Sequence, residues 1–273
     1  RMRQALALWQ RAGDATGQAR VLANLGIVGL QQGRYRQAAA SLRRALVLYR
    51  ESGDGFGEGR ALNNLGLIQL RQGRYLRAAE CFGQALALHR QVGDTANETA
   101  CLANVGVVHL REGDYEQAAG RLGEALELSR RIGMPLNEAY SLTNLGLVDL
   151  RLGRHQRAIS RLRQALALCR QLGERSSEAE ARNGLGAALL AAGRPGDARS
   201  QHATALSLAT QMGEIYEQAR AHDGLAATYH ATGDAGNARR HQQHAAALYT
   251  RLGAPEADQV RARLNRADHD RRR

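Results

Sequence analysis

Apolar residues recur along the chain with the spacing of amphipathic α-helices. Between positions 62 and 70 they form one stripe, which consists of Leu62, Leu65, Ile68 and Leu70. After a short polar gap comes a second stripe, which consists of Ala78, Phe82, Ala85, Leu86 and Leu88. Each stripe covers one side of a helix and leaves the other side polar. The pattern therefore predicts two helices joined by a turn.

Two series of glycines show that this helix pair is repeated. The first series recurs every 40 residues at Gly13, Gly53, Gly93, Gly133, Gly173, Gly213 and Gly253. The second lies half a period later at Gly33, Gly73, Gly113, Gly153, Gly193 and Gly233. Glycine suits the left-handed conformation that ends a helix. Asp14, Asp54 and Asp94 follow glycines of the first series and suit the N-cap of the next helix. The unit is therefore helix, turn, helix, turn.

The register of the glycines also sets the expected organisation of the chain. Residues 1–13 match a second helix whose first helix is missing, which suggests a segment of a longer protein. Six 40-residue repeats then occupy 15–254, a capping helix is expected at 255–268, and 269–273 are expected to be disordered. One helix pair cannot bury its own apolar face, so neighbouring pairs must stack. We therefore expect a single domain over 1–268.

Small residues form columns in this register, which predicts closely packed helices. One column is Ala38, Ala78, Ala118, Ala158, Ala198 and Ala238. A second is Ala45, Ala85, Ala125, Ala165, Ala205 and Ala245. A third is Gly26, Gly66, Gly106, Gly146 and Gly186, with Ala226 in the last repeat.

Composition agrees with an all-helical protein. Aromatic residues make up 4% of the chain and there are three prolines, which disfavours β-sheet. The net charge is +12 and all 38 basic residues are arginine. The arginines recur with the repeat rather than in one run, so direct binding of nucleic acid by this segment is not expected. No apolar run approaches the roughly 18 residues of a membrane span and no signal peptide is visible, which indicates a cytoplasmic protein.

Residues that could support catalysis or bind a cofactor do not form a recognisable motif. Cys81, Cys101 and Cys169 are far apart and lie on apolar stripes, which favours packing over metal binding. His241 and His244 share a helix face, but no third ligand is near them in the sequence. We find no nucleophile elbow, phosphate loop or metal motif. The sequence predicts neither an enzyme nor a bound metal or other cofactor.

The repeat resembles the tetratricopeptide repeat. The resemblance rests on Asn64-Leu65-Gly66, on Gly73-Arg74-Tyr75, and on Ala78, Phe82 and Ala85, in a pattern that recurs six times. It implies an all-α right-handed superhelix of tandem helix-turn-helix units, an α-α solenoid. The 40-residue period is similar to that of kinesin light chains and Pins/LGN adaptors. The last two repeats depart from the pattern, because His202 and Gln242 replace the aromatic residue at Phe82.

The resemblance also implies where a partner would bind. In such solenoids the first helices line a concave groove that holds a protein or peptide segment. The positions carried over are Arg20, Asn24, Arg60, Asn63, Asn64, Arg71, Asn104, Arg111, Asn144 and Arg151. The asparagines form a ladder that ends at Gly184 and Gly224, so we expect a ligand to contact repeats one to four. An alternative is that the asparagines bond neighbouring helices and that the arginines are solvated surface.

The C-terminal third resembles the end of AfsR/SARP-type transcriptional regulators. The similar segments are 198–202, 216–226, 245–249, 255–258 and 260–264. Such regulators join a DNA-binding domain and an NB-ARC/STAND module to tetratricopeptide repeats, which implies a sensor arm of an actinobacterial activator. The partner would then be a peptide, a protein or another domain of the same polypeptide. Two alternatives are open: a free-standing adaptor of the Pins/LGN or kinesin-light-chain type, and a peptide-pheromone receptor.

Overall fold

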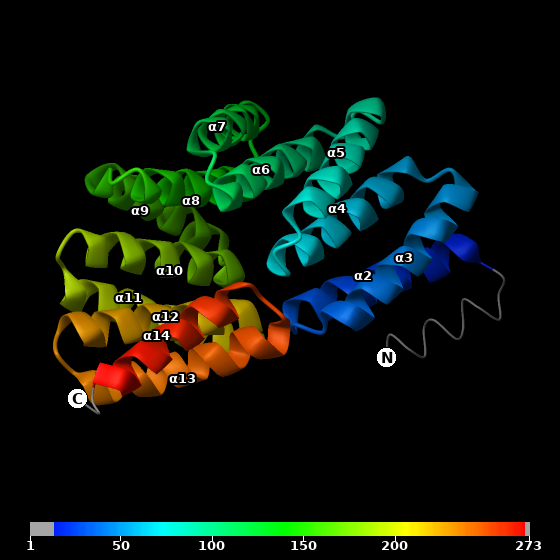
Figure 1. Cartoon of the computed structure of the whole chain (residues 1–273). Helices are drawn as coiled ribbons and strands as arrows, with labels where there is room; N and C mark the ends of the chain where they lie inside the picture. The colour runs from blue at the N-terminus through cyan, green and yellow to red at the C-terminus, as the bar shows by residue number, and fades with distance from the viewer. Residues whose placement is uncertain (1–13, 271–273) are drawn as a thin grey trace. The chain divides into compact units, whose positions relative to one another are not determined.

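The computed structural model describes residues 14–270, with side chains to residue 266, and every element in this part of the chain is an α-helix (Figure 1). The described residues form two compact units that divide between Gly133 and Met134, called here the N-terminal and C-terminal units. The N-terminal unit contains α2 (Ala15–Gln31), α3 (Tyr35–Ser52), α4 (Gly55–Arg71), α5 (Tyr75–Gln91), α6 (Thr95–Glu112) and α7 (Tyr115–Arg131). The C-terminal unit contains α8 (Pro135–Arg151), α9 (His155–Leu172), α10 (Arg175–Ala191), α11 (Pro195–Met212), α12 (Ile215–Ala231), α13 (Ala235–Leu252) and α14 (Glu256–Asp270).

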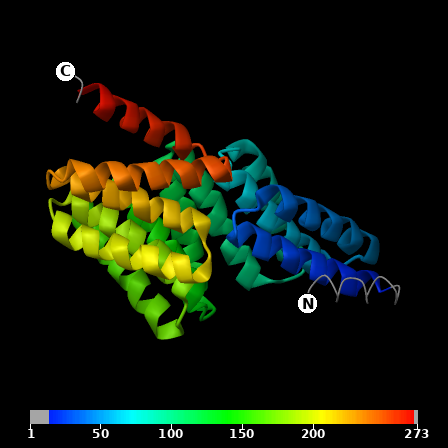
Figure 2. The same ribbon diagram turned by 90° about the horizontal axis from the view of Figure 1, so that it is seen from below.

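Within each unit the helices pack in the predicted pairs. In the N-terminal unit α2 packs on α3, α4 on α5 and α6 on α7, and in the C-terminal unit α8 packs on α9, α10 on α11 and α12 on α13 (Figures 1 and 2). Successive pairs stack, because the second helix of one pair contacts the first helix of the next, as in α3 with α4 and α11 with α12. The prediction of an all-α fold built from tandem helix pairs is confirmed.

The last helix, α14, keeps the register of the repeat. It packs against α13. The Tyr216 hydroxyl donates to Glu256 Oε1 at 2.6 Å, and Arg263 Nη2 lies 2.6 Å from Asp223 Oδ1. Both pairs join residues 40 apart, so α14 occupies the place of a further first helix. Residues 1–13 and 271–273, on which we expected a partial repeat and part of a disordered tail, lie outside the described residues.

Glycine turns and aspartate caps end and begin the helices as the sequence suggests. Twelve glycines adopt positive φ, for example 68° at Gly53, and no other residue type does so in the described part of the chain. The Asp14 and Asp54 carboxylates accept the backbone N–H of Gly17 and Gly57, each at 2.8 Å. These bonds satisfy N–H groups that a helix leaves unpaired in its first turn.

The small-residue columns lie where helices approach most closely. The alanines of both predicted columns are at most 4% exposed. A Cβ added at Gly66 would lie 2.6 Å from the Phe82 ring, which is fully buried. A larger residue on one helix therefore requires a smaller one on the helix that faces it.

The same constraint explains why the asparagine ladder ends in glycine. A Cβ at Gly184 would lie 2.7 Å from Leu162, and one at Gly224 would lie 2.2 Å from the His202 ring. His202 is 2% exposed and its Nδ1 lies 3.2 Å from Asn183 Oδ1. Glycine at 184 and 224 thus makes room for side chains of the preceding second helix.

The close approach at Gly66 gives a stability test. Gly66→Ala should lower the free energy of unfolding by roughly 1–3 kcal/mol, because the buried Phe82 ring cannot move aside. Gly83→Ala lies in the partner helix and meets nothing within 4 Å, so it should raise stability by up to about 1 kcal/mol through helix propensity. Urea denaturation followed by circular dichroism compares the two. Equal stability of both variants would contradict the packing argument.

The buried imidazole of His202 predicts a specific pH dependence. Burial, helped by the charge of Arg220, lowers its pKa from 6.5 to about 4. Between these values the unfolded chain binds a proton that the folded chain rejects, so the free energy of unfolding falls as the pH falls. The loss approaches about 3 kcal/mol by pH 4, at about 1.4 kcal/mol per pH unit. The effect is absent above pH 7, where His202 is neutral in both states.

The matched control is His202→Phe, which restores the residue type of the Phe82 position. Other histidines with a lowered pKa, such as His222, titrate in both proteins, so the difference between the two curves isolates His202. The measurement is the urea midpoint between pH 7.5 and 4. The argument fails if both proteins lose stability equally over this range.

Candidate functional site

A small pocket in the N-terminal unit brings four of the predicted site residues together. It has a volume of about 120 Å³ and lies between α2, α3 and α4. Its lining consists of Arg20, Ala23, Asn24, Ile27, Tyr49, Arg60, Ala61 and Asn64. Residues 20 and 24 lie one helical turn apart on α2, and residues 60 and 64 repeat this spacing on α4. The 40-residue register therefore places two Arg-Asn pairs around one cavity.

The two guanidinium groups of the pocket carry charge that the described part of the protein does not neutralise. Arg20 and Arg60 are exposed, and no carboxylate within residues 14–266 forms an ion pair with either. The Arg60 guanidinium lies over the Phe56 ring, 5.6 Å from its centroid, which orients it without removing its charge. The pocket is consequently electropositive.

Tyr49, which the sequence analysis did not identify, brings a phenol from the second helix α3 into the pocket. Its side chain is 5% exposed. Burial raises the pKa of the phenol and Asp54 adds to this, while the charges of Arg60 and Arg20 lower it. The hydroxyl therefore stays protonated at neutral pH and can donate a hydrogen bond. Only its position at the end of α3, next to the turn before α4, could have indicated this role.

The amides of the pocket are partly free for a ligand. Asn64 Nδ2 donates to the backbone oxygen of Arg60 at 2.9 Å, and this bond uses one of its two amide hydrogens. Asn24 is exposed. The apolar side chains Ala23, Ile27 and Ala61 complete the wall. A volume of 120 Å³ equals about four water molecules, which is room for a carboxylate and its methylene carbons.

The other asparagines predicted in the N-terminal unit lie elsewhere. Asn104 is buried, and its Nδ2 donates to Asn63 Oδ1 at 2.8 Å, which joins α6 to α4. Cys101 Sγ lies 3.6 Å from the same oxygen. Arg71 and Arg111 are half-buried near the C-terminal ends of α4 and α6, outside the pocket. The Asn63–Asn104 pair thus corresponds to the structural alternative considered for the ladder.

In the C-terminal unit the predicted residues do not form a comparable pocket. Asn144 is buried, and its Nδ2 donates to the backbone oxygen of Tyr140 at 2.9 Å. Arg151 is exposed and is the last residue of α8. The structure therefore groups Arg20, Asn24, Arg60 and Asn64 around one pocket, and none of the other six predicted residues lines it.

The C-terminal unit carries opposite charges where the N-terminal unit carries like charges. Glu180 and Arg220 occupy the positions of Arg20 and Arg60 in later repeats, and Arg220 Nη1 lies 3.9 Å from Glu180 and 3.0 Å from Glu217. Burial would lower the pKa of Arg220, but the two carboxylates outweigh it and hold the pKa above its usual range. Asn183 Nδ2 also donates to Glu217 Oε2 at 3.1 Å. The charge of Arg220 is therefore already paired within the protein.

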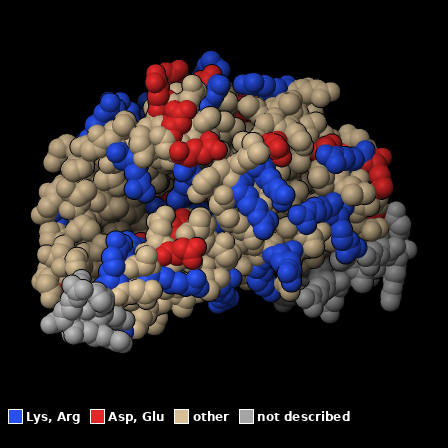
Figure 3. Space-filling model, viewed as in Figure 1, with Lys and Arg blue, Asp and Glu red and all other residues tan. Residues whose placement is uncertain are grey.

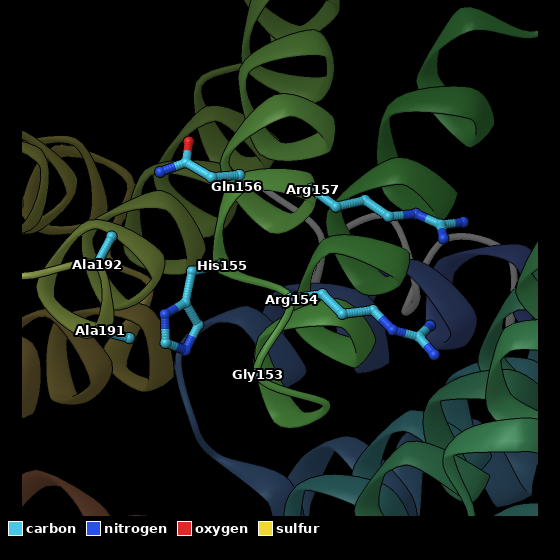
Figure 4. A pocket seen from close by; sticks show the side chains of 7 residues that line it. All are labelled: Gly153, Arg154, His155, Gln156, Arg157, Ala191 and Ala192. Carbon is cyan, nitrogen blue, oxygen red and sulfur yellow. The ribbon is translucent and has the colours of Figure 1, made fainter.

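A second, open hollow lies in the C-terminal unit, beside the start of α9 (Figure 4). It measures about 680 Å³ and is lined by Gly153, Arg154, His155, Gln156, Arg157, Ala191 and Ala192. Arg154 and Arg157 extend to one side of it and His155 to the other (Figure 4). The buried Asp149 lies 3.8 Å and 3.3 Å from these two guanidiniums, and Arg161 Nη1 lies 2.6 Å from it. Asp149 partly compensates the arginines, so this hollow is the weaker candidate.

Charge is dispersed over the face of the molecule seen in Figure 3. Figure 3 shows arginine groups spread across the visible face with acidic groups between them. No helix in the described part of the chain is both long and apolar enough to cross a membrane.

Comparison with known proteins identifies the repeat. Tetratricopeptide-repeat profiles match residues 57–131 and 136–211, and a further one matches residues 21–55. A search of curated proteins found no match. The fold is similar to NprR in complex with its cognate peptide NprX, with a TM-score of 0.70, 17% identity, and coverage of 88% of this chain and 70% of that one. It is also similar to a Rap protein complexed with competence and sporulation factor, with a TM-score of 0.68, 14% identity, and coverage of 92% and 75%.

A third similar structure is BtubC (BKLC) from P. vanneervenii, with a TM-score of 0.56, 19% identity, and coverage of 87% of this chain and 92% of that one. At these identities the structural likenesses show the fold alone. The family profiles together with the repeated helix pairs establish that the chain belongs to the tetratricopeptide-repeat family.

Proposed function

We propose that the chain is a non-catalytic, cytoplasmic binding module whose N-terminal unit holds a segment of protein or peptide through a carboxylate placed between Arg20 and Arg60. The observation that carries this proposal is the pocket between α2, α3 and α4, in which two guanidiniums lack a carboxylate partner among the described residues. A carboxylate can accept hydrogen bonds from both groups, and charge-assisted bonds of this kind are stronger than neutral ones.

The repeat itself supports a carboxylate as the ligand group. At the same positions in α10 and α12, Glu180 supplies the negative charge that faces Arg220. The N-terminal unit has arginine at both positions and no carboxylate among the described residues pairs with them, so we infer that the ligand supplies the negative charge. A ligand carboxylate would then have the role that Glu180 has in the C-terminal unit.

The amides and the phenol would extend recognition beyond the charge. Asn24 and Asn64 lie one turn beyond the arginines and can bond a peptide backbone, which offers both N–H and C=O groups. The Tyr49 hydroxyl can donate to the same carboxylate or to a neighbouring carbonyl. Recognition of this kind favours an extended segment with at least one acidic residue.

For the biological setting we propose the sensor or regulatory arm of an AfsR/SARP-type transcriptional regulator. Support comes from the similar segments in the C-terminal third, such as 216–226, and from the exclusive use of arginine, which suits a high-GC actinobacterial genome. The partner would be another domain of the same polypeptide or a separate protein. A nucleotide-binding module encoded upstream in the same gene would support this setting, and its absence would argue for a free-standing adaptor.

A second candidate is a receptor for a short signalling peptide. The observation that favours it is the structural similarity to NprR, solved with its cognate peptide NprX, and to a Rap protein solved with competence and sporulation factor. A free peptide and a segment of a larger protein would present the same carboxylate and backbone groups. Thermal-shift screening with short peptides distinguishes them, because a receptor should be stabilised far more by one particular sequence, whereas a module for a protein segment should respond about equally to acidic peptides of different sequence.

The pocket charge gives a binding test. Short synthetic peptides rich in Asp and Glu should bind, and the same peptides with Asn and Gln should not. Arg20→Gln and Arg60→Gln should each weaken binding at least tenfold, about 1.4 kcal/mol, and added salt should weaken it in the wild type. Fluorescence anisotropy of labelled peptides measures both effects. The control is Arg44→Gln on the exposed face of α3, and equal loss in that variant would show non-specific attraction.

The asparagines give a test that separates recognition from structure. Asn64→Ala should leave the free energy of unfolding nearly unchanged and weaken binding of the acidic peptides, because Asn64 lies at the pocket. Asn104→Ala should instead cost about 1 kcal/mol or more of stability, because it removes the amide bond between α6 and α4 and leaves Asn63 Oδ1 with only the weak thiol donor of Cys101. Urea denaturation and anisotropy on both variants provide the measurements. If Asn104→Ala weakens peptide binding and Asn64→Ala lowers stability instead, the binding site would be the Asn63–Asn104 pair.

A further inference from the structure

An exposed aromatic ring lies beside the pocket of the N-terminal unit. Phe56 is on α4, one helical turn before Arg60, and it is 46% exposed. The equivalent positions of the other repeats are Thr16, Ala96, Leu136, Ser176 and Tyr216. Tyr216 is the other aromatic residue among these six, and it is buried. Phe56 is therefore the one member of this column that presents a ring to solvent.

The Phe56 ring is supported by a second ring beneath α4. It lies edge-to-face with His89 of α5, with centroids 6.3 Å apart and planes at 81°. His89 is fully buried, and its Nδ1 lies 3.2 Å from Asp94 Oδ2. A Cβ added at Gly59 would lie 2.7 Å from this imidazole, so α4 packs directly against it. The Phe56 ring consequently cannot sink into the core, and it stays at the surface.

The supporting imidazole is uncharged at neutral pH. Burial has the largest effect and lowers the pKa of His89, and the charge of Arg60 adds to this, while Asp94 acts in the opposite direction. A neutral imidazole does not repel the guanidinium that lies over Phe56. Among Arg60, Phe56 and His89 the positive charge therefore resides on Arg60 alone.

The exposed face of the ring orients Arg60. The Arg60 Cζ lies 5.6 Å from the ring centroid, within the range of a cation–π interaction. Glu58, the acidic residue nearest to Arg60 in the sequence, pairs with Arg50, whose Nε lies 2.7 Å from Glu58 Oε1. An arginine side chain that is free in water loses rotamer freedom when a ligand binds it. The ring removes part of that loss before binding, and it leaves the guanidinium charge available.

We propose that Phe56 is a positioning residue, which holds the Arg60 guanidinium where the ligand carboxylate binds and does not itself contact the ligand. This inference rests on the proposed function of the pocket. Arg20 lacks the equivalent ring, because Thr16 occupies the position one turn before it. The two guanidiniums of the pocket therefore differ: Arg60 is oriented by a neighbouring ring before binding, and Arg20 is not oriented in this way.

A double-mutant cycle tests whether Phe56 acts through Arg60. Phe56→Leu should weaken binding of the acidic peptides about two- to fivefold, which is the size of an exposed cation–π interaction. In the Arg60→Gln background the same substitution should leave binding unchanged. Fluorescence anisotropy at low salt measures all four proteins, because electrostatic binding is strongest there. Phe56→Tyr keeps a ring and should bind like the wild type.

Two controls address a purely structural effect of the substitution. Leu136→Ala removes an exposed apolar side chain from the equivalent position of the C-terminal unit, where Tyr140 replaces the arginine, and it should leave binding unchanged. Urea denaturation should give nearly equal free energies of unfolding for Phe56→Leu and the wild type, because Phe56 is half-exposed.

A nuclear magnetic resonance measurement on the free protein completes the test. The Arg60 Nε–H resonance, assigned by its loss in Arg60→Gln, should move downfield in Phe56→Leu because the ring current is removed. If the wild type binds no acidic peptide, the proposed function fails and this inference fails with it. If the peptides bind but the resonance does not move, or if Phe56→Leu has the same effect in both backgrounds, the inference alone is overturned.

Discussion

The structure depends on the close approach of paired helices at glycine and alanine. Gly66 lies against the Phe82 ring, and Gly224 lies against His202, at distances that leave no room for a Cβ. This contact excludes the insertion of a larger side chain at one position unless the facing helix changes as well. Because the glycine turns fix both helix lengths, the contact recurs every 40 residues. Equivalent residues of neighbouring repeats therefore lie next to one another, and the identity of each residue determines whether they attract, repel or pack.

That register explains how one scaffold supports two kinds of polar site. In the N-terminal unit Arg20 and Arg60 repel each other across a small cavity, while in the C-terminal unit Glu180 and Arg220 attract. The repulsion is small as long as water screens two exposed guanidiniums. A ligand carboxylate that displaced this water would be attracted by both guanidiniums. The Glu180–Arg220 pair provides no such attraction, because Arg220 already faces a carboxylate.

Much of the fold could be predicted from the sequence, because period, turns and caps are local features. That Arg20, Asn24, Arg60 and Asn64 repeat on two successive first helices also followed from the register, but that these four line one cavity did not. What could not be predicted is whether each asparagine of the ladder is buried or exposed in the folded chain. Asn104 and Asn144 occupy the same column as Asn64 yet are buried, because small differences in helix packing decide the exposure of a side chain at the edge of a helix contact. Tyr49 was missed for another reason, because it lies on the second helix α3 and the sequence analysis placed the groove on the first helices alone.

The difference between Asn64 and Asn104 gives a physical criterion for a site in a repeat protein. Asn104 is buried, and its amide joins α6 to α4 by a hydrogen bond to Asn63. Removing this amide should therefore lower the free energy of unfolding. Asn64 forms a hydrogen bond within its own helix, and its side chain can still donate and accept hydrogen bonds at the pocket. Removing it should therefore weaken ligand binding. Neither the residue type nor its place in the column distinguishes the two. The distinguishing property is whether the folded chain has already satisfied the polar group. By this criterion the proposed binding site of the N-terminal unit lies between α2 and α4.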